Sequence, residues 1–197
     1  MTHAVNDDAL DILFRKAHTH RAWREGQVTP QMLMAIYDLA RWAPTTNNTN
    51  PGRFYFIVSP EAKERLKPHL TKGNVEQTMK APATAIIAYD LEFYEKMGKL
   101  SPNPNARESW MQKSAVEIEA AAFRNSSLQG GYFIMAARAI GLDCGPMSGF
   151  NNASLDKEFF SGTSIKSNFL CNLGFGDETN VRPRAGRLDF DDACKIL

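Results

Sequence analysis

The chain has 197 residues, of which 43% are hydrophobic and 23% charged, and its 23 basic and 22 acidic side chains leave a formal net charge of +1. This length can fill one core, so we expect a single domain over residues 1–197. The near-neutral charge argues against nucleic acid as a partner, and no apolar run approaches the length of a membrane-spanning helix. Three widely spaced cysteines and a polar, acidic start argue against a disulfide framework and a secretory signal, so we expect a cytoplasmic protein.

The first half of the chain predicts helices that alternate with strands. Apolar side chains recur at helical spacing between residues 7 and 17, and Thr29-Pro30 has the composition of a helix start. The apolar and β-branched run Thr84–Asp90 is typical of a buried strand. Helices are therefore expected at 7–17, 30–40, 60–70 and 74–80, and strands at 53–59 and 84–90.

The second half contains an irregular stretch, a long helix and a further strand. Residues 98–109 hold two prolines and several polar side chains, which predicts an irregular surface excursion that acts as a lid. A helix is expected from 114 to 140, with Gly141 as its C-terminal cap, and its nearly all-apolar segment 132–137 predicts a central, buried position. No regular βαβ repeat is present, which favours an α+β fold. The order ends with a short helix at 154–160 and a strand at 167–174.

The most informative segment is Ala43–Phe54, between a predicted helix and a predicted strand. Small hydroxyl and amide side chains lie between Pro44 and Pro51, with no charge before Arg53. Such a segment combines many hydrogen-bond donors and acceptors with a stiff backbone, which suits recognition of a flat, polar heterocycle. A connecting loop without a ligand has the same composition, so this alternative stays open.

A phosphate-bearing ligand would have to be held mainly by side chains. Gly174-Phe175-Gly176 lacks the third glycine of a dinucleotide fingerprint, and the chain has no Walker A loop. Two basic segments are available instead, His18-Thr19-His20-Arg21 and Arg182-Pro183-Arg184, the second followed by Arg187. Arginine binds phosphate with two parallel hydrogen bonds, whereas a solvated surface is the alternative for the second segment.

The segment Gly145–Phe150 is a second candidate for contact with a ligand. Its glycines on either side of Pro146 permit close approach of the backbone, although a tight surface turn has the same composition. The four histidines form no cluster with cysteine at metal-ligand spacing, so no metal is expected. Cys144 and Cys171 lie in apolar stretches, which favours a structural role for both.

The polar run 43–54 resembles the Pro-Ser-Ser-x-Asn-x-Gln-Pro-Trp loop of the FMN-dependent nitroreductase family. Thr45 and Thr46 occupy the serine positions, Asn48 matches the asparagine, Asn50 replaces glutamine and Gly52 replaces tryptophan. The resemblance implies that Pro44 to Asn48 lie across the flavin of a partner subunit. At Gly52, the missing indole is expected to open space for substrate.

The resemblance covers residues 19–187. Thr19 and Arg21 align with a segment that touches the flavin ring and phosphate, although Ala17, beside His18, replaces its first arginine. The same resemblance assigns the ring to Asn74, the phosphate to Arg182 and Arg184, and a backbone N–H near flavin N5 to Ser148. Gln77 replaces a basic residue. The implied FMN-binding set is His18, Thr19, His20, Arg21, Pro44, Thr45, Thr46, Asn48, Asn74, Gln77, Ser148, Gly149, Arg182 and Arg184.

The resemblance also implies a fold, an assembly and a reaction. The expected fold is α+β and nitroreductase-like, with a mixed central sheet flanked by helices in an intertwined homodimer. NAD(P)H would reduce FMN and leave, and an acceptor would then take hydride from N5 in a ping-pong cycle. No side chain is an obvious catalytic acid, so the catalytic residue stays unassigned.

Within the family, three segments resemble the malonic semialdehyde reductase branch of pyrimidine utilisation, also called HadB/RutE: Arg124–Gln129, Gly145–Phe150 and Lys166-Ser167-Asn168. This implies reduction of a small aldehyde, malonic semialdehyde, to 3-hydroxypropionate. Its carboxylate would need a cation, for which Arg53, Arg124 and Lys80 are the candidates. A broad nitro-compound or quinone reductase and a flavin-binding module without turnover are the alternatives.

Overall fold

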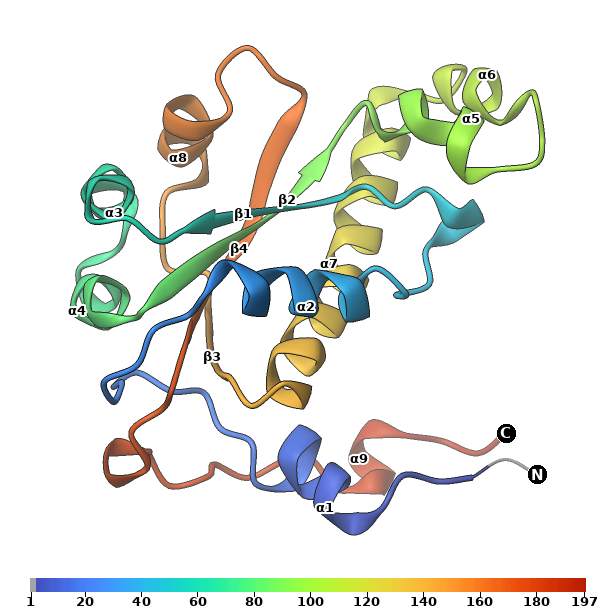
Figure 1. The fold of residues 1–197 in the computed structure, drawn as a ribbon. Helices are drawn as coiled ribbons and strands as arrows, with labels where there is room; N and C mark the ends of the chain where they lie inside the picture. Colours follow the sequence, from blue (N-terminus) through green and yellow to red (C-terminus); the bar gives the residue numbers. More distant parts are fainter. Residues whose placement is uncertain (1–2) are drawn as a thin grey trace.

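A computed structural model describes residues 3–197, and its centre is a four-stranded sheet in the order β1-β2-β4-β3 (Figure 1). The strands are β1 (Gly52–Ile57), β2 (Ala83–Asp90), β3 (Asp143–Met147) and β4 (Ile165–Gly174). All three neighbouring pairs are antiparallel. The mixed sheet expected from the resemblance is therefore not found among these strands. Strand direction depends on how helices connect the strands, and strand composition does not record it.

Strand β2 is the centre of the core because helices cover both of its faces. Ala85 and Ile87 pack with Phe133 of the long helix α7, while Ile86 and Ala88 pack with Leu155 of α8 on the other side. This burial explains why β2 reads as a continuous apolar run instead of an alternating one. The helices of these two layers are α2 (Pro30–Ala40) and α7 (Ala115–Ala139) on one face, and α3 (Pro60–Leu66), α4 (Lys72–Lys80) and α8 (Asn152–Phe159) on the other.

Local capping explains where the predicted helices begin and end. The Thr29 hydroxyl accepts from the backbone N–H of Met32 at 3.3 Å, and Pro30 opens α2 as expected. Ser114 and Glu117 form a reciprocal capping box at the start of α7. Gly141 follows that helix with φ of +83°, a left-handed conformation that glycine adopts at little cost. The chain starts with α1 (Asp7–Leu10) and a π-turn at Asp11–Arg15.

The prediction of an irregular excursion at 98–109 is wrong for most of this segment. Two short helices, α5 (Met97–Leu100) and α6 (Ala106–Met111), occupy its ends, and only the residues between them lack helical structure. Phe93 and Trp110 are buried with edge-to-face rings 5.0 Å apart, so this lobe has a small core of its own. The prolines fall inside the short connection, which is why their presence did not exclude helices on either side.

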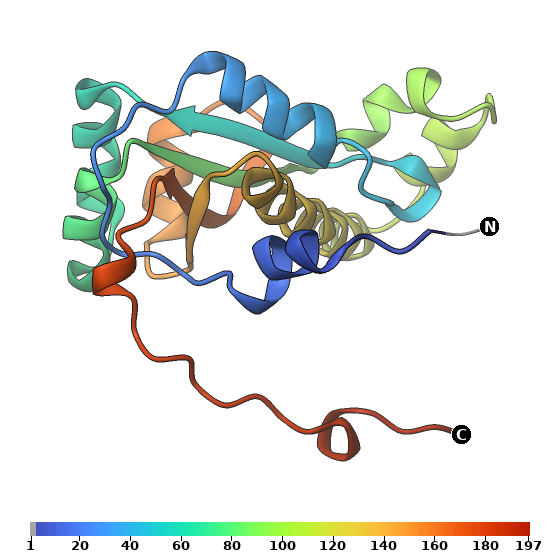
Figure 2. The same ribbon diagram turned by 60° about the horizontal axis from the view of Figure 1, so that its bottom comes forward.

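The C-terminal arm, residues 181–197, extends away from the body of the chain (Figure 2). It carries one short helix, α9 (Phe190–Ala193), and its apolar side chains Leu188 and Ile196 are 73% and 86% exposed. Within residues 3–197, no helix has the length and apolar character needed to cross a membrane.

Candidate functional site

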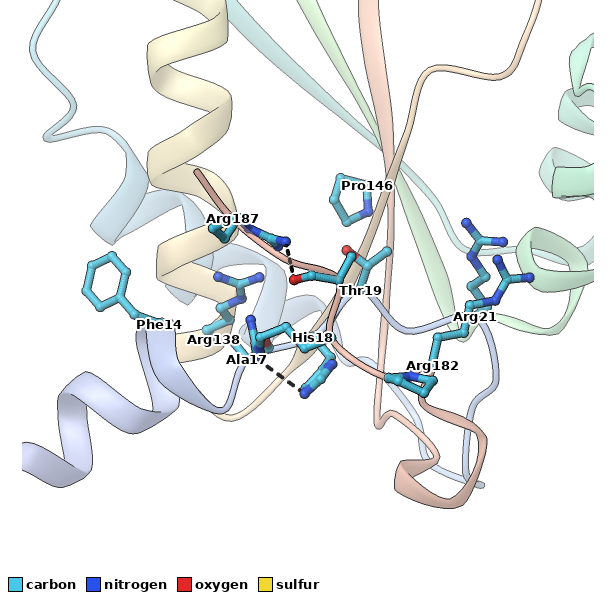
Figure 3. Close-up of a pocket in the computed structure, with 12 residues that line it drawn as sticks. Phe14, Ala17, His18, Thr19, Arg21, Arg138, Pro146, Arg182 and Arg187 are labelled. Atoms are coloured by element: carbon cyan, nitrogen blue, oxygen red, sulfur yellow. Dashed lines mark hydrogen bonds between the residues drawn. The ribbon is translucent and has the colours of Figure 1, made fainter. Parts of the chain in front are cut away.

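An open cavity of about 620 Å³ lies between the N-terminal segment, the end of α7 and the start of the C-terminal arm (Figure 3). Its volume is within the range of small-molecule sites. It brings together five of the residues predicted from sequence, His18, Thr19, Arg21, Arg182 and Arg184. The other lining residues are Phe14, Ala17, Arg138, Pro146, Pro183, Ala185 and Arg187.

The N-terminal segment reaches the cavity because it runs beside β3. Thr19 forms an isolated parallel bridge with Cys144, and the backbone N–H of His20 donates to the Cys144 carbonyl at 3.0 Å. Side chains alternate along an extended segment, so Thr19 and Arg21 lie on the cavity side and His20 on the other. His20 is only 6% exposed, and its Nε2 lies 3.4 Å from Asp143 Oδ1. Its side chain therefore does not line the cavity.

Arginine dominates the charge of the cavity. Five arginines line it, and the lining contains no carboxylate. Arg184 Nη2 donates to the carbonyls of Arg15 and Ala17 at 2.9 and 2.8 Å, which ties the C-terminal arm to the N-terminal segment. Burial and the nearby Arg184 charge lower the pKa of His18 below its usual value, which disfavours the charged form of this imidazole. The arginines alone supply the positive charge, in the form that suits a phosphate.

Arg138 was missed from the sequence, although it lines the cavity from the last turn of α7 and donates from Nη1 to the Leu13 carbonyl at 3.0 Å. Its only local signal is a basic residue near a helix C-terminus, which ordinarily interacts with the helix dipole.

Asn74, Gln77 and Gly149 form a second cluster, which follows β3. The Gly149 carbonyl accepts from Asn74 Nδ2 at 2.8 Å and from both the backbone and the hydroxyl of Thr71 at 3.0 and 2.9 Å. Gln77 Nε2 in turn donates to Asn74 Oδ1 at 2.6 Å. The Asn74 amide therefore holds the turn in place, and its second N–H group forms no hydrogen bond with the rest of residues 3–197. Ser148, in the same turn, is exposed.

The predicted loop residues Pro44, Thr45, Thr46 and Asn48 do not line the arginine cavity. The backbone N–H of Thr46 donates to Asn125 Oδ1 of α7 at 2.8 Å. Arg138 lies thirteen residues further along this helix, which corresponds to about 20 Å. Within one chain, the loop and the cavity are thus separated by more than half of α7.

The asparagines of this loop adopt backbone conformations that the turn requires, in addition to offering polar side chains. Asn47, Asn48 and Asn50 all have positive φ, between 43° and 57°, a region that asparagine enters more readily than most residues. The richness in amides, which we interpreted as recognition of a heterocycle, is therefore partly a requirement of the turn. Asn48 also donates from Nδ2 to the Leu100 carbonyl of α5 at 2.9 Å, which joins the loop to the α5–α6 lobe.

Two buried amides of α7 anchor the loop, and sequence reasoning missed this role. Asn125 and Gln129 are 1% and 4% exposed and lie one turn apart. Gln129 Oε1 accepts from the backbone N–H of Gly52 at 2.7 Å. A Cβ at position 52 would lie 2.6 Å from the same oxygen. The expectation that Gly52 opens space for substrate is therefore wrong at the Cβ position, because Gln129 fills it.

Two of the three cations considered for a substrate carboxylate already have acidic partners. Arg53 Nη2 lies 2.7 Å from Asp90 Oδ2, and Lys80 Nζ lies 2.7 Å from Glu76 Oε1. Burial opposes ionisation of Asp90, but hydrogen bonds from Ser164 and the backbone, together with Arg53, lower its pKa below the usual value. Arg124 forms no side-chain hydrogen bond or ion pair with the rest of residues 3–197.

Comparison with known proteins decides the family. Residues 14–176 match the sequence profile of the nitroreductase family. The chain belongs to this family. It is 52% identical over 192 residues to a Burkholderia lata protein and 52% identical over 196 residues to one from Stenotrophomonas maltophilia K279a, with at least 98% of each chain covered. Both relatives are named "Putative NADH dehydrogenase/NAD(P)H nitroreductase".

The fold of this nitroreductase is likewise shared with solved structures. A nitroreductase from Exiguobacterium sibiricum, crystallised in complex with FMN, superposes with a TM-score of 0.86 at 20% identity, over all of both chains. This confirms the α+β, nitroreductase-like fold predicted from the sequence. Among the described residues, no three His, Cys, Asp or Glu side chains gather as a metal site would require.

Proposed function

We propose that this nitroreductase is an FMN-dependent NAD(P)H oxidoreductase. The observation that carries the proposal is the cavity lined by five arginines and no carboxylate, beside a turn held by Asn74. A single phosphate group with a planar ring matches this set of donors, since the arginines offer several charged hydrogen bonds and the turn offers backbone and amide donors. FMN is the cofactor, which the family and the FMN complex of the Exiguobacterium sibiricum protein support, and NAD(P)H is the electron donor, which the names of the two relatives support.

Each part of the site has a distinct task in this proposal. Arg21 and Arg182, which both line the cavity, hold the phosphate, and Arg184 closes the site by binding the N-terminal segment to the arm. Thr19 faces the same space, and Asn74 and Ser148 meet the polar edge of the ring. When bound, FMN supplies the hydride chemistry, and the protein supplies position and electrostatics.

We further propose a homodimer in which Pro44–Asn48 of one subunit complete the site of the other. The separation of loop and cavity along α7 supports this, because one chain alone cannot bring them together. Exposed apolar side chains on α2 and on the C-terminal arm support it too: Met34 and Leu188 are 67% and 73% exposed. Light scattering should give a mass near twice 22.0 kDa. A stable monomer loaded with flavin would contradict this arrangement.

The proposed acceptor is malonic semialdehyde, which would be reduced to 3-hydroxypropionate. Resemblance of Arg124–Gln129 and Gly145–Phe150 to the corresponding branch supports it, and buried Asn125 and Gln129 give those matches a structural role in holding the loop. The second candidate is a general nitro-compound or quinone reductase, which the names of the two relatives favour.

Cofactor and acceptor are tested separately. Flavin released by denaturation should be FMN on chromatography, and FAD as the main species would refute the assignment. With FMN-loaded protein, kcat/KM for malonic semialdehyde should exceed that for propanal by at least about tenfold, because a charged hydrogen bond to the carboxylate distinguishes them. Equal values for both aldehydes, with faster turnover of a nitroaromatic compound, would favour the general reductase.

A further inference from the structure

A second cavity, of about 640 Å³, lies on the loop side of the molecule, lined by residues from the end of α2, the start of β1, α5 and the middle of α7. Asn48 and Gly52 of the polar loop form one of its edges. We call it the loop cavity. It contains none of the residues that line the arginine cavity.

The charged side chains that line the loop cavity are all cations. Arg41, Arg53, Lys96 and Lys99 line it, and its lining includes no carboxylate. Arg53 is paired with Asp90 and fixed by the carbonyls of Asn50 and Gly52 at 3.0 Å, so its role is structural. Lys96 and Lys99, in contrast, form no side-chain hydrogen bond or ion pair within residues 3–197. Arg41 has only a 4.0 Å contact with the exposed Asp38.

The lining of the loop cavity is also rich in aromatic side chains, Tyr37, Trp42, Phe54 and Phe56. Phe54 stacks on buried Phe133 with ring centroids 5.3 Å apart and planes 9° apart, and Tyr37 meets the edge of Phe54 at 6.1 Å. The floor includes the amide of Gln129, which Gly52 holds in place at 2.7 Å. A cavity lined by both aromatic rings and cations is complementary to a small, flat molecule that carries an anionic group.

We propose that the loop cavity binds the electron acceptor, and that Lys96 and Lys99 select acceptors carrying a carboxylate. The ligand class is a small organic carboxylate whose reducible group is planar, such as a carbonyl or nitro group. The inference rests on the proposed function for its chemistry, because the loop that borders this cavity is the one that would cross the flavin of the other subunit. It assigns the carboxylate to Lys96, which precedes α5, and Lys99, within α5, in place of the paired Arg53 and Lys80.

The test compares two acceptors of the same shape that differ in charge, 4-nitrobenzoate and 4-nitrobenzamide, with FMN-loaded protein. The wild type should show kcat/KM at least about tenfold higher for the benzoate, since a lysine pair contributes a charge-assisted contact that the amide lacks. In the double variant Lys96→Gln/Lys99→Gln this ratio should fall below about threefold. The matched control Lys67→Gln/Lys157→Gln removes the same charge from the turn that follows α3 and from α8, both outside the cavity lining, and should keep the wild-type ratio.

The outcomes separate this inference from the proposed function. Equal use of both acceptors by the wild type, or an unchanged ratio in the Lys96/Lys99 variant, would overturn it while leaving the reductase intact. A raised KM for NADPH alone would assign the lysines to the phosphate of the co-substrate and also overturn it. If neither acceptor is turned over, the proposed oxidoreductase function is refuted. Trp42 lies in the lining, so quenching of its fluorescence by 4-nitrobenzoate, lost in the Lys96/Lys99 variant, would still support the site.

Discussion

The side chain of Gln129 occupies the space that a Cβ at position 52 would need, so a larger residue at Gly52 should destabilise the protein. In Gly52→Ala the new Cβ would lie 2.6 Å from Gln129 Oε1 and 2.9 Å from its Cδ. Gln129 is 4% exposed, and its oxygen accepts from the Gly52 N–H at 2.7 Å. The amide cannot avoid the methyl group and keep this hydrogen bond, so it has to move within a packed region.

The cost follows from the contacts that are lost. Losing the net contribution of one hydrogen bond costs about 1 kcal/mol, and leaving a buried amide oxygen without a partner costs about 1–3 kcal/mol. Alanine in place of glycine recovers about 0.4–1 kcal/mol by restricting the unfolded chain. Gly52→Ala should therefore lower the free energy of unfolding by about 1–3.5 kcal/mol.

A double-mutant cycle measures the effect. Urea unfolding of Gly52→Ala, Gln129→Ala and the double variant is compared at one protein and FMN concentration, because ligand binding shifts apparent stability. In the Gln129→Ala background the methyl group finds space, so most of the cost should disappear, with a coupling of about 1 kcal/mol or more. Gly131→Ala is the control: its Cβ would meet nothing within 4 Å, so it should stabilise α7 by about 0.5–1 kcal/mol. An identical cost in both Gln129 backgrounds would refute the steric argument.

Three further predictions concern the cofactor, a buried lysine and the thiols. Arg184→Ala should weaken FMN binding by about tenfold or more in a fluorescence titration, because it removes one cation of the arginine cavity and the link between the C-terminal arm and the N-terminal segment, and unchanged affinity would contradict both roles. Lys63 donates to the Thr78 and Ala81 carbonyls, and burial lowers its pKa to about 8. Between pH 8 and 10.5 this lysine is therefore protonated in the unfolded chain but largely deprotonated in the folded protein. The unfolding free energy of the wild type relative to Lys63→Met should therefore rise across that window, by up to about 3 kcal/mol, and a flat difference would contradict the burial argument. Cys144 and Cys171 are buried, and the pKa of Cys171 is raised by its contact with Cys144 and by burial, so folded protein should show no more than one reactive thiol per chain.

Features set by neighbouring residues were predictable from the sequence. Thr29-Pro30 begins α2 and Gly141 ends α7 because each acts on backbone groups within one helical turn. The continuous apolar run of β2 predicted a strand covered on both faces, since a strand with one solvent-exposed face would alternate apolar and polar side chains. The two basic segments that line the arginine cavity could also be predicted, because clustered arginines are evident in the sequence itself.

The tertiary structure alone decided which of these residues meet and what each one faces. His20 points into the core while its neighbours Thr19 and Arg21 line the cavity, because the segment pairs with β3. Lys96 and Lys99 become a pair beside the polar loop only because the α5–α6 lobe folds on its own small core. Such arrangements depend on packing between segments tens of residues apart, and no pattern within one segment records the partner that will cover it.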